Sequence, residues 1–200
     1  MPQYFTANDT WNGGFYELCM EFYPPSNQRL FAALQTIWKH PVLDGCYLDS
    51  SKEPTEQIRV SPLENLIEGG NHLYGLVTLP NAIQVACGTV QVREVNGSDW
   101  LDFYIPMGAL ATAYDVQAFP FERDKGMHDD WRKELDNLLH EIGNFIFTSF
   151  PFEIGLIGHE CSGAAYAQDI IQQGIPTPRN IGYLWPENRH LNYYPRTLNA

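Results

Sequence analysis

Hydrophobic and polar residues alternate along residues 15–23, which read FYELCMEFY. Alternation with a period of two is typical of a strand that is buried on one face. One face of this strand would carry Tyr16, Leu18, Met20 and Phe22, and the other Glu17, Cys19 and Glu21. We therefore expect a half-buried strand with two carboxylates on its more polar face.

Two stretches show the three-and-four spacing of an amphipathic helix. The first follows Ser26, a natural N-cap, and ends at His40-Pro41. The second begins at Asp129 or Asp130 and ends at Phe150-Pro151. Its apolar stripe consists of Trp131, Leu135, Leu138, Leu139, Ile142, Phe145 and Ile146. Each helix is followed by an apolar stretch with strand character, residues 42–49 and 152–161.

The remaining strands are expected at residues 72–79, 81–95, 100–110, 181–185 and 191–194. Asn96-Gly97 joins two of them and predicts a hairpin, because a type I′ turn needs positive φ at both central positions. Short helices are expected over residues 63–68, before Gly69-Gly70, and over residues 162–173, with Ser162 as cap.

Residues 15–95 and 101–197 give the same order of elements, so we expect an α+β fold with a largely antiparallel sheet and two main helices. A tandem duplication of a β-α-β-(short α)-β-β unit would explain this order. The predicted organisation is an irregular lead-in at 1–14, a first half at 15–97 and a second half at 98–200, with both halves packed as one globular domain.

This order of elements resembles the tandem strand-helix-strand-strand modules of the GyrI-like small-molecule-binding proteins. The resemblance is one of architecture, since the chain contains no sequence motif of that family. It implies a small-molecule site in a groove between the two halves.

The charge balance narrows the classes of partner. Twelve basic and 24 acidic residues give a net charge of −12, which repels nucleic acid and anionic lipid and favours a basic partner. Hydrophobic stretches are too short to span a membrane, and the N-terminus has no signal-peptide pattern. We therefore expect a cytoplasmic protein that binds neither nucleic acid nor a membrane.

Cysteine spacing indicates no cofactor. Cys19, Cys46, Cys87 and Cys161 lie far apart in apolar segments, without a C-x-x-C or H-E-x-x-H motif. We expect reduced, buried thiols, with no metal and no cofactor.

The end of the strand at 152–161 is the first candidate site. On a regular strand Glu153, His159 and Cys161 point to one side and Glu160 to the other. A metal site would need more ligands, and a Cys161 nucleophile with His159 as base would need a geometry that a strand does not guarantee. The simpler interpretation is a strand end whose histidine is hydrogen-bonded and whose cysteine is packed.

A second candidate combines the first strands of the two halves. If these strands are neighbours, Glu17, Asp102 and Tyr104 would line a groove. The alternative is that they form a solvated outer face.

These observations favour a non-enzymatic binding or interaction protein that engages a basic macromolecule, such as an immunity-type protein. A small-molecule-binding module with a groove between the halves is the first alternative. The second is a hydrolase-like enzyme that uses Glu153, His159 or Cys161. The sequence specifies neither the partner nor an oligomeric state.

Overall fold

The computed structural model describes residues 3–62, 72–95, 97–116 and 130–197. Within these ranges the strands are β1 (Phe15–Phe22), β2 (Leu43–Tyr47), β3 (His72–Thr78), β4 (Gln84–Arg93), β5 (Asp99–Pro106), β6 (Ile154–His159), β7 (Gly182–Glu187) and β8 (His190–Tyr194). The helices are α1 (Asn27–Ile37), α3 (Met107–Leu110), α4 (Asp130–Ser149) and α5 (Ala167–Gln173), with a 3₁₀ turn η1 (Pro54–Glu56). The short helix predicted at residues 63–68 lies outside the described residues.

The strands in the described ranges form one antiparallel sheet of eight, in the order β2-β3-β4-β5-β1-β6-β7-β8. The predicted α+β class with a largely antiparallel sheet is therefore confirmed. The hairpin predicted around Asn96-Gly97 is also present, since β4 and β5 pair directly.

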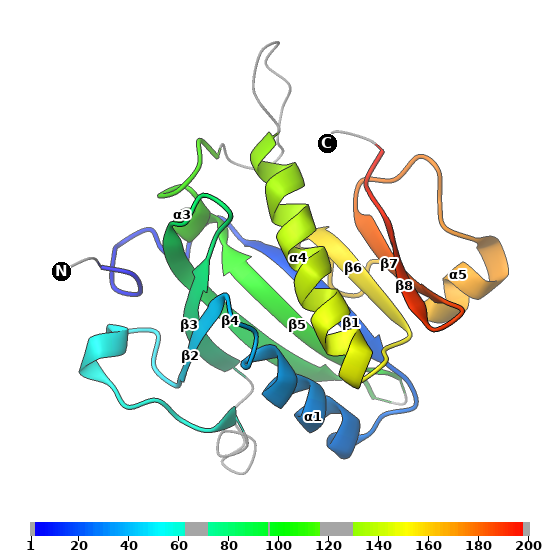
Figure 1. Ribbon diagram of the computed structural model, residues 1–200, viewed down its shortest axis with the longest axis horizontal. Coiled ribbons are helices and arrows are strands. Elements are labelled where there is room, and N and C mark those ends of the chain that lie inside the picture. The colour runs from blue at the N-terminus through cyan, green and yellow to red at the C-terminus, as the bar shows by residue number, and fades with distance from the viewer. Residues whose placement is uncertain (1–2, 63–71, 96, 117–129, 198–200) are drawn as a thin grey trace.

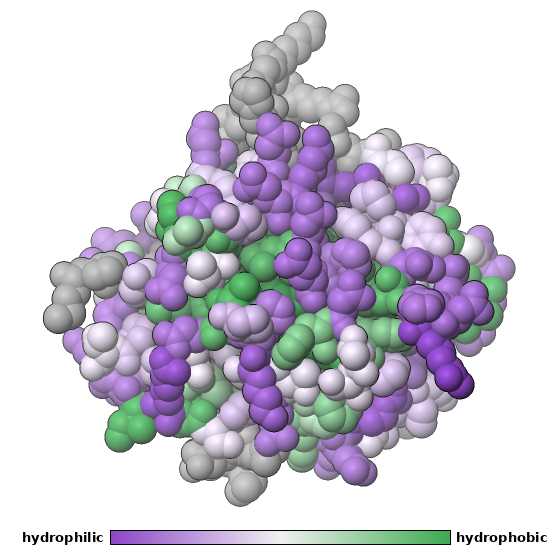
Figure 2. All heavy atoms as spheres, in the orientation of Figure 1, coloured by the Kyte–Doolittle hydropathy of each residue, from purple (hydrophilic) through white to green (hydrophobic). Residues whose placement is uncertain are grey.

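Helices α1 and α4 lie across the same face of the sheet (Figure 1). Ser26 caps α1 as expected, its side chain accepting a hydrogen bond from the backbone N–H of Arg29. The apolar stripes of both helices pack on the even-numbered side chains of β1 and form the main core. Hydrophilic side chains cover the outer side of α4 (Figure 2). No helix in the described ranges is long and apolar enough to cross a membrane.

The other face of the sheet has a smaller core. Cys19, Trp100, Leu156 and Cys161 pack there against Ile170 of α5 and their neighbours. The segment between β6 and α5 crosses this face, and α5 starts at Ala167 rather than near Ser162. The helix predicted at 162–173 is thus shorter than expected, because residues 162–166 form the non-helical part of this crossing.

The two halves follow different paths through the sheet. Their first strands, β1 and β5, pair at the centre, but β2 lies at one edge whereas β6 lies directly beside β1. A duplication would relate β1 to β5 and β2 to β6. In this strand order, a twofold rotation that exchanges β1 with β5 exchanges β2 with β8 instead. The sheet therefore does not reproduce the element-by-element correspondence that the duplication hypothesis predicts.

Candidate functional sites

The first candidate site lies at the centre of the face of the sheet opposite α1 and α4. In the β1–β5 pair, Glu17 is opposite Tyr104 and Cys19 is opposite Asp102. Side chains of opposite residues share a face, so the alternation of β1 and β5 brings these four groups together. The pairing of the two strands that the second candidate required is thus present.

These side chains do not line an open groove. Glu17 is 6% exposed, Asp102 is 3% exposed, and Tyr104 is also buried. Tyr104 packs over Gly88 and lies 3.2 Å from His72 Nδ1. Because all three are covered, both expectations for them, a groove and a solvated outer face, are wrong.

A sharp turn after β6 completes this site. Glu160 has φ of 44°, a left-handed conformation that L-residues rarely adopt, and it ends the strand. The chain then turns onto the face opposite α1 and α4, where Cys161 Sγ lies 3.8 Å from Cys19 Sγ and 3.9 Å from the Glu17 carbonyl oxygen. We call Glu17, Cys19, Asp102 and Cys161 the carboxylate–thiol cluster.

Ser162 holds both carboxylates of the cluster. Its backbone N–H donates to Glu17 Oε1 at 3.0 Å, and its hydroxyl donates to Asp102 Oδ2 at 2.8 Å. Within the described chain, Asp102 Oδ1 is buried without a hydrogen-bond partner. A buried carboxylate oxygen in this state is costly, because it has lost its water without gaining a donor.

Burial disfavours the charged forms of the groups in the cluster. It raises the pKa of Glu17 to about 7, with the Asp102 charge adding to the effect and the Ser162 amide opposing it. Burial likewise raises the pKa of Asp102 to about 6, against the opposing Ser162 hydroxyl and Cys19 thiol. The pKa values of the Cys19 and Cys161 thiols are raised by burial as well. In the absence of a cation, the cluster therefore holds protons that exposed acids would release.

The residues of the predicted strand-end site are not brought together. Glu153 precedes β6, where it forms an ion pair with Arg29 at 3.1 Å and accepts from the Tyr23 amide. His159 is the register partner of Tyr16, and its Nε2 lies 3.2 Å from the Gly13 carbonyl oxygen. The prediction that Glu153, His159 and Cys161 share one side is wrong, because the turn at Glu160 moves Cys161 to the opposite face.

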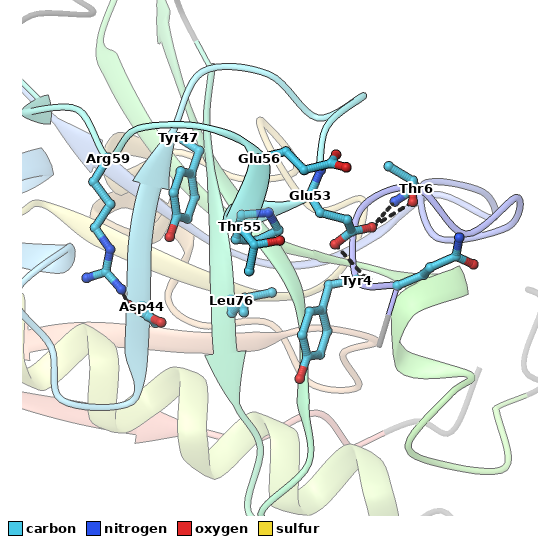
Figure 3. A pocket seen from close by; sticks show the side chains of 11 residues that line it. Tyr4, Thr6, Asp44, Tyr47, Glu53, Thr55, Glu56, Arg59 and Leu76 are labelled. Atoms are coloured by element: carbon cyan, nitrogen blue, oxygen red, sulfur yellow. Dashed lines mark hydrogen bonds and ion pairs between the residues drawn. The ribbon is translucent and has the colours of Figure 1, made fainter. Parts of the chain in front are cut away.

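A second candidate site is a cleft of about 630 Å³ at the β2 edge of the sheet. Its lining combines the lead-in, β2, the loop around η1 and Leu76 of β3, as Figure 3 shows. The principal side chains are Tyr4, Thr6, Asp44, Tyr47, Glu53, Thr55, Glu56, Arg59 and Leu76. Asp44 and Leu76 are register partners, which places the cleft on the face opposite α1 and α4 as well.

Glu53 anchors the lead-in against this loop. Its carboxylate accepts from the backbone N–H groups of Tyr4, Phe5 and Thr6 and from the Thr6 hydroxyl, at 2.7 to 3.3 Å. Burial opposes ionisation of Glu53, but these four donors outweigh it and lower its pKa. The cleft wall is therefore fixed, and Glu53 stays negatively charged.

The cleft is acidic and partly aromatic. Its lining carries three carboxylates and one guanidinium, a net charge of −2. The guanidinium of Arg59 is paired with Asp44 (Figure 3), whereas Glu56 is exposed and accepts a hydrogen bond from the Glu53 amide. Sequence reasoning identified this loop as polar but not as a site, because its partners lie almost 50 residues away.

Comparisons of this chain with models of known protein families, with curated proteins and with solved structures found no match. The fold and the geometry of the two sites are therefore the evidence for the class of protein.

Proposed function

We propose that this chain is a non-enzymatic, cytoplasmic binding protein that engages a basic protein partner through the cleft at the β2 edge. The observation that carries the proposal is the acidic cleft itself, with Glu56 exposed at its rim and the tyrosine rings of Tyr4 and Tyr47 in its wall. Carboxylates beside aromatic faces suit a lysine ammonium or an arginine guanidinium. An immunity-type protein that neutralises a basic toxin is one member of this class.

Apolar side chains next to the cleft support a macromolecular partner rather than a free cation. Residues 46–49 and 57–60 run side by side, joined by hydrogen bonds from the Val60 amide to Cys46 O and between Gln57 and Asp49. This ribbon carries Ile58, which is 87% exposed, and the partly exposed Leu48. Exposed apolar residues beside a charged cleft are typical of protein interfaces.

The overall charge supports the same partner. With a net charge of −12, the protein attracts a basic partner over distances of about 10 Å at moderate ionic strength. Charge of this kind mainly accelerates association, while the cleft and the apolar ribbon would supply specificity.

A short arginine-containing peptide is the probe for a first test. We expect ¹⁵N NMR shifts at Asp44, Tyr47 and residues 53–59 on titration, and none with an acidic peptide of equal length. Glu56→Gln keeps the acceptor for the Glu53 amide but removes the charge, so it should weaken binding about fivefold, equivalent to about 1 kcal/mol. Arginine amide alone should bind more weakly than the peptide, because it does not reach Ile58.

Glu141→Gln is the matched control, since it removes one exposed carboxylate of α4 on the helix-covered side. It should leave the affinity within the error of the wild type. Shifts that map to α4, or an equal loss of affinity in both variants, would show that the peptide responds to net charge and that the cleft is not the site.

A further inference from the structure

The two sulfur atoms of the carboxylate–thiol cluster are spaced as ligands of one metal ion. Cys19 Sγ and Cys161 Sγ lie 3.8 Å apart. Two thiolates on a tetrahedral zinc ion, each with a Zn–S bond of about 2.3 Å, are about 3.8 Å apart. A disulfide would need a separation of about 2.05 Å. The observed spacing therefore matches a shared metal.

A carboxylate joins the two sulfurs. The ligand atoms of Glu17, Cys19 and Cys161 all lie within 4.8 Å of one another, and all three residues are buried. Exposed acidic groups are common without a metal ion, whereas these three residues are buried. Among the described residues, Glu17 takes part in no ion pair.

Asp102 supplies an independent observation. Asp102 is the register partner of Cys19 and is only 3% exposed. Its Oδ1 has no hydrogen-bond partner in the described chain. The Ser162 hydroxyl occupies the other oxygen, Oδ2, and so fixes the orientation of the carboxylate. Asp102 lies outside the group of three residues whose ligand atoms are within 4.8 Å of one another, so its buried Oδ1 would have to move to reach the fourth coordination position.

We propose that Cys19, Cys161, Glu17 and Asp102 bind one zinc ion. Thiolate ligands select zinc over magnesium and calcium, which prefer oxygen ligands throughout. On binding, each thiol, and each carboxyl ligand that is protonated, releases its proton to solvent, and no electron is transferred. Glu17, Cys19 and Cys161 supply three ligands, and a movement of the Asp102 carboxylate would complete a set of four protein ligands, which makes the site structural.

The ion would join three segments of the chain. Glu17 and Cys19 come from β1, Asp102 from β5, and Cys161 from the segment between β6 and α5. Zinc would therefore fasten residues 160–167 to the centre of the sheet, with Ser162 as the outer partner of both carboxylates. This inference does not depend on the cleft at the β2 edge, and either proposal can fail alone.

Zinc content and cobalt spectroscopy test the site in the intact 200-residue chain. We expect about one zinc per chain after saturation with zinc salt and removal of excess metal. Cobalt in place of zinc should give thiolate-to-metal charge-transfer absorption and the d–d bands of a tetrahedral ion. Absence of stoichiometric zinc, a cobalt spectrum without thiolate bands, or a Cys19–Cys161 disulfide that persists in reductant would each overturn the proposal.

Variants assign the ligands. Cys161→Ser should weaken zinc binding about 100-fold or more, and Asp102→Asn about tenfold. Cys46→Ser is the matched control, because Cys46 is also buried and its thiol donates to the Val60 carbonyl, a bond that serine can keep. It should bind zinc like the wild type. Equal loss in Cys46→Ser and Cys161→Ser would contradict the assignment.

A thermal measurement on the wild type covers the case in which the cysteine variants do not fold. Zinc should raise the melting temperature, a chelator should reverse the rise, and the same concentration of magnesium should have no effect. Asp102→Asn, which leaves both thiols in place, should show a smaller rise. A rise of equal size with magnesium, or none with zinc, would count against the site.

Discussion

Asp99 and Asp102 lie three residues apart on β5, and both side chains are buried, yet they have opposite surroundings. Asp99 is 0% exposed and accepts from Arg93 Nε and Nη2 at 2.6 and 2.8 Å and from the Ser26 amide at 2.8 Å. Burial opposes its ionisation, but the Arg93 guanidinium and these donors outweigh it and lower its pKa. Asp102 has the Ser162 hydroxyl and no guanidinium, and burial raises its pKa to about 6.

The difference shows that partners, together with the depth of burial, decide whether a carboxylate in this sheet is charged. Asp99 lies beside Arg93 of β4, which supplies a cation, and beside Ser26 at the start of α1, which supplies a backbone amide. Asp102 resides on the opposite face, among an acid and two thiols that offer few donors. A buried acid without a cation favours a proton or a metal ion, and the predictions below separate its behaviour from that of Asp99.

The largest effect is expected from pH in protein kept free of metal by a chelator. Folding raises the pKa of Glu17 from 4.5 to about 7, so between these values the folded state holds more protons than the unfolded state. Stability contributed by protonated Glu17 is therefore lost as the pH rises through about 7. The loss should reach about 3 kcal/mol from pH 5 to pH 8.

Glu17→Gln isolates this contribution, because glutamine keeps an acceptor for the Ser162 amide. The partly buried His40, His72 and His140 have pKa values lowered by burial, and their titration acts in the opposite direction. The quantity to measure is thus the difference between wild type and Glu17→Gln in urea unfolding at each pH. The same pH profile in both proteins would show that Glu17 does not titrate in this range.

A smaller effect is expected from one substitution made at the two compared sites. In metal-free protein at pH 7.5, Asp99→Asn should cost about 2 kcal/mol, because it weakens charge-assisted bonds to Arg93 and to the start of α1. Asp102→Asn should change stability by less than about 1 kcal/mol, since it removes a buried charge and keeps an acceptor for Ser162. Urea midpoints measure both, and equal losses would refute the contrast.

The local elements of this fold could be predicted from sequence because their causes are local. Alternation identified β1, the Ser26 cap identified α1, and Asn96-Gly97 identified the β4–β5 hairpin. The same alternation selected Glu17 and Asp102 as candidates, and the expected pairing of their strands is present.

The carboxylate–thiol cluster could not be predicted as a unit. Its members are up to 144 residues apart, and Cys161 reaches it only because one residue, Glu160, leaves the strand conformation. The sequence prediction assumed that the strand continues regularly to residue 161, and it therefore placed Cys161 on the wrong face of the sheet. The cleft was missed for a related reason, since the anchoring of the lead-in by Glu53 spans 49 residues.

The smallest effect is expected at Glu160. The position of Cys161 in the carboxylate–thiol cluster depends on this residue, whereas the surroundings of Asp99 do not. Its φ of 44° is accessible to glycine and unfavourable for a β-branched residue. Glu160→Gly should stay within about 0.5 kcal/mol of the wild type, because relief of strain offsets the greater entropy of the unfolded chain. Glu160→Val should cost about 1 kcal/mol, since the left-handed region is sterically crowded for valine. Both variants lose the same charge, so the gap between their urea midpoints reports the backbone conformation alone, and equal midpoints would mean that this turn does not hold Cys161 in the cluster.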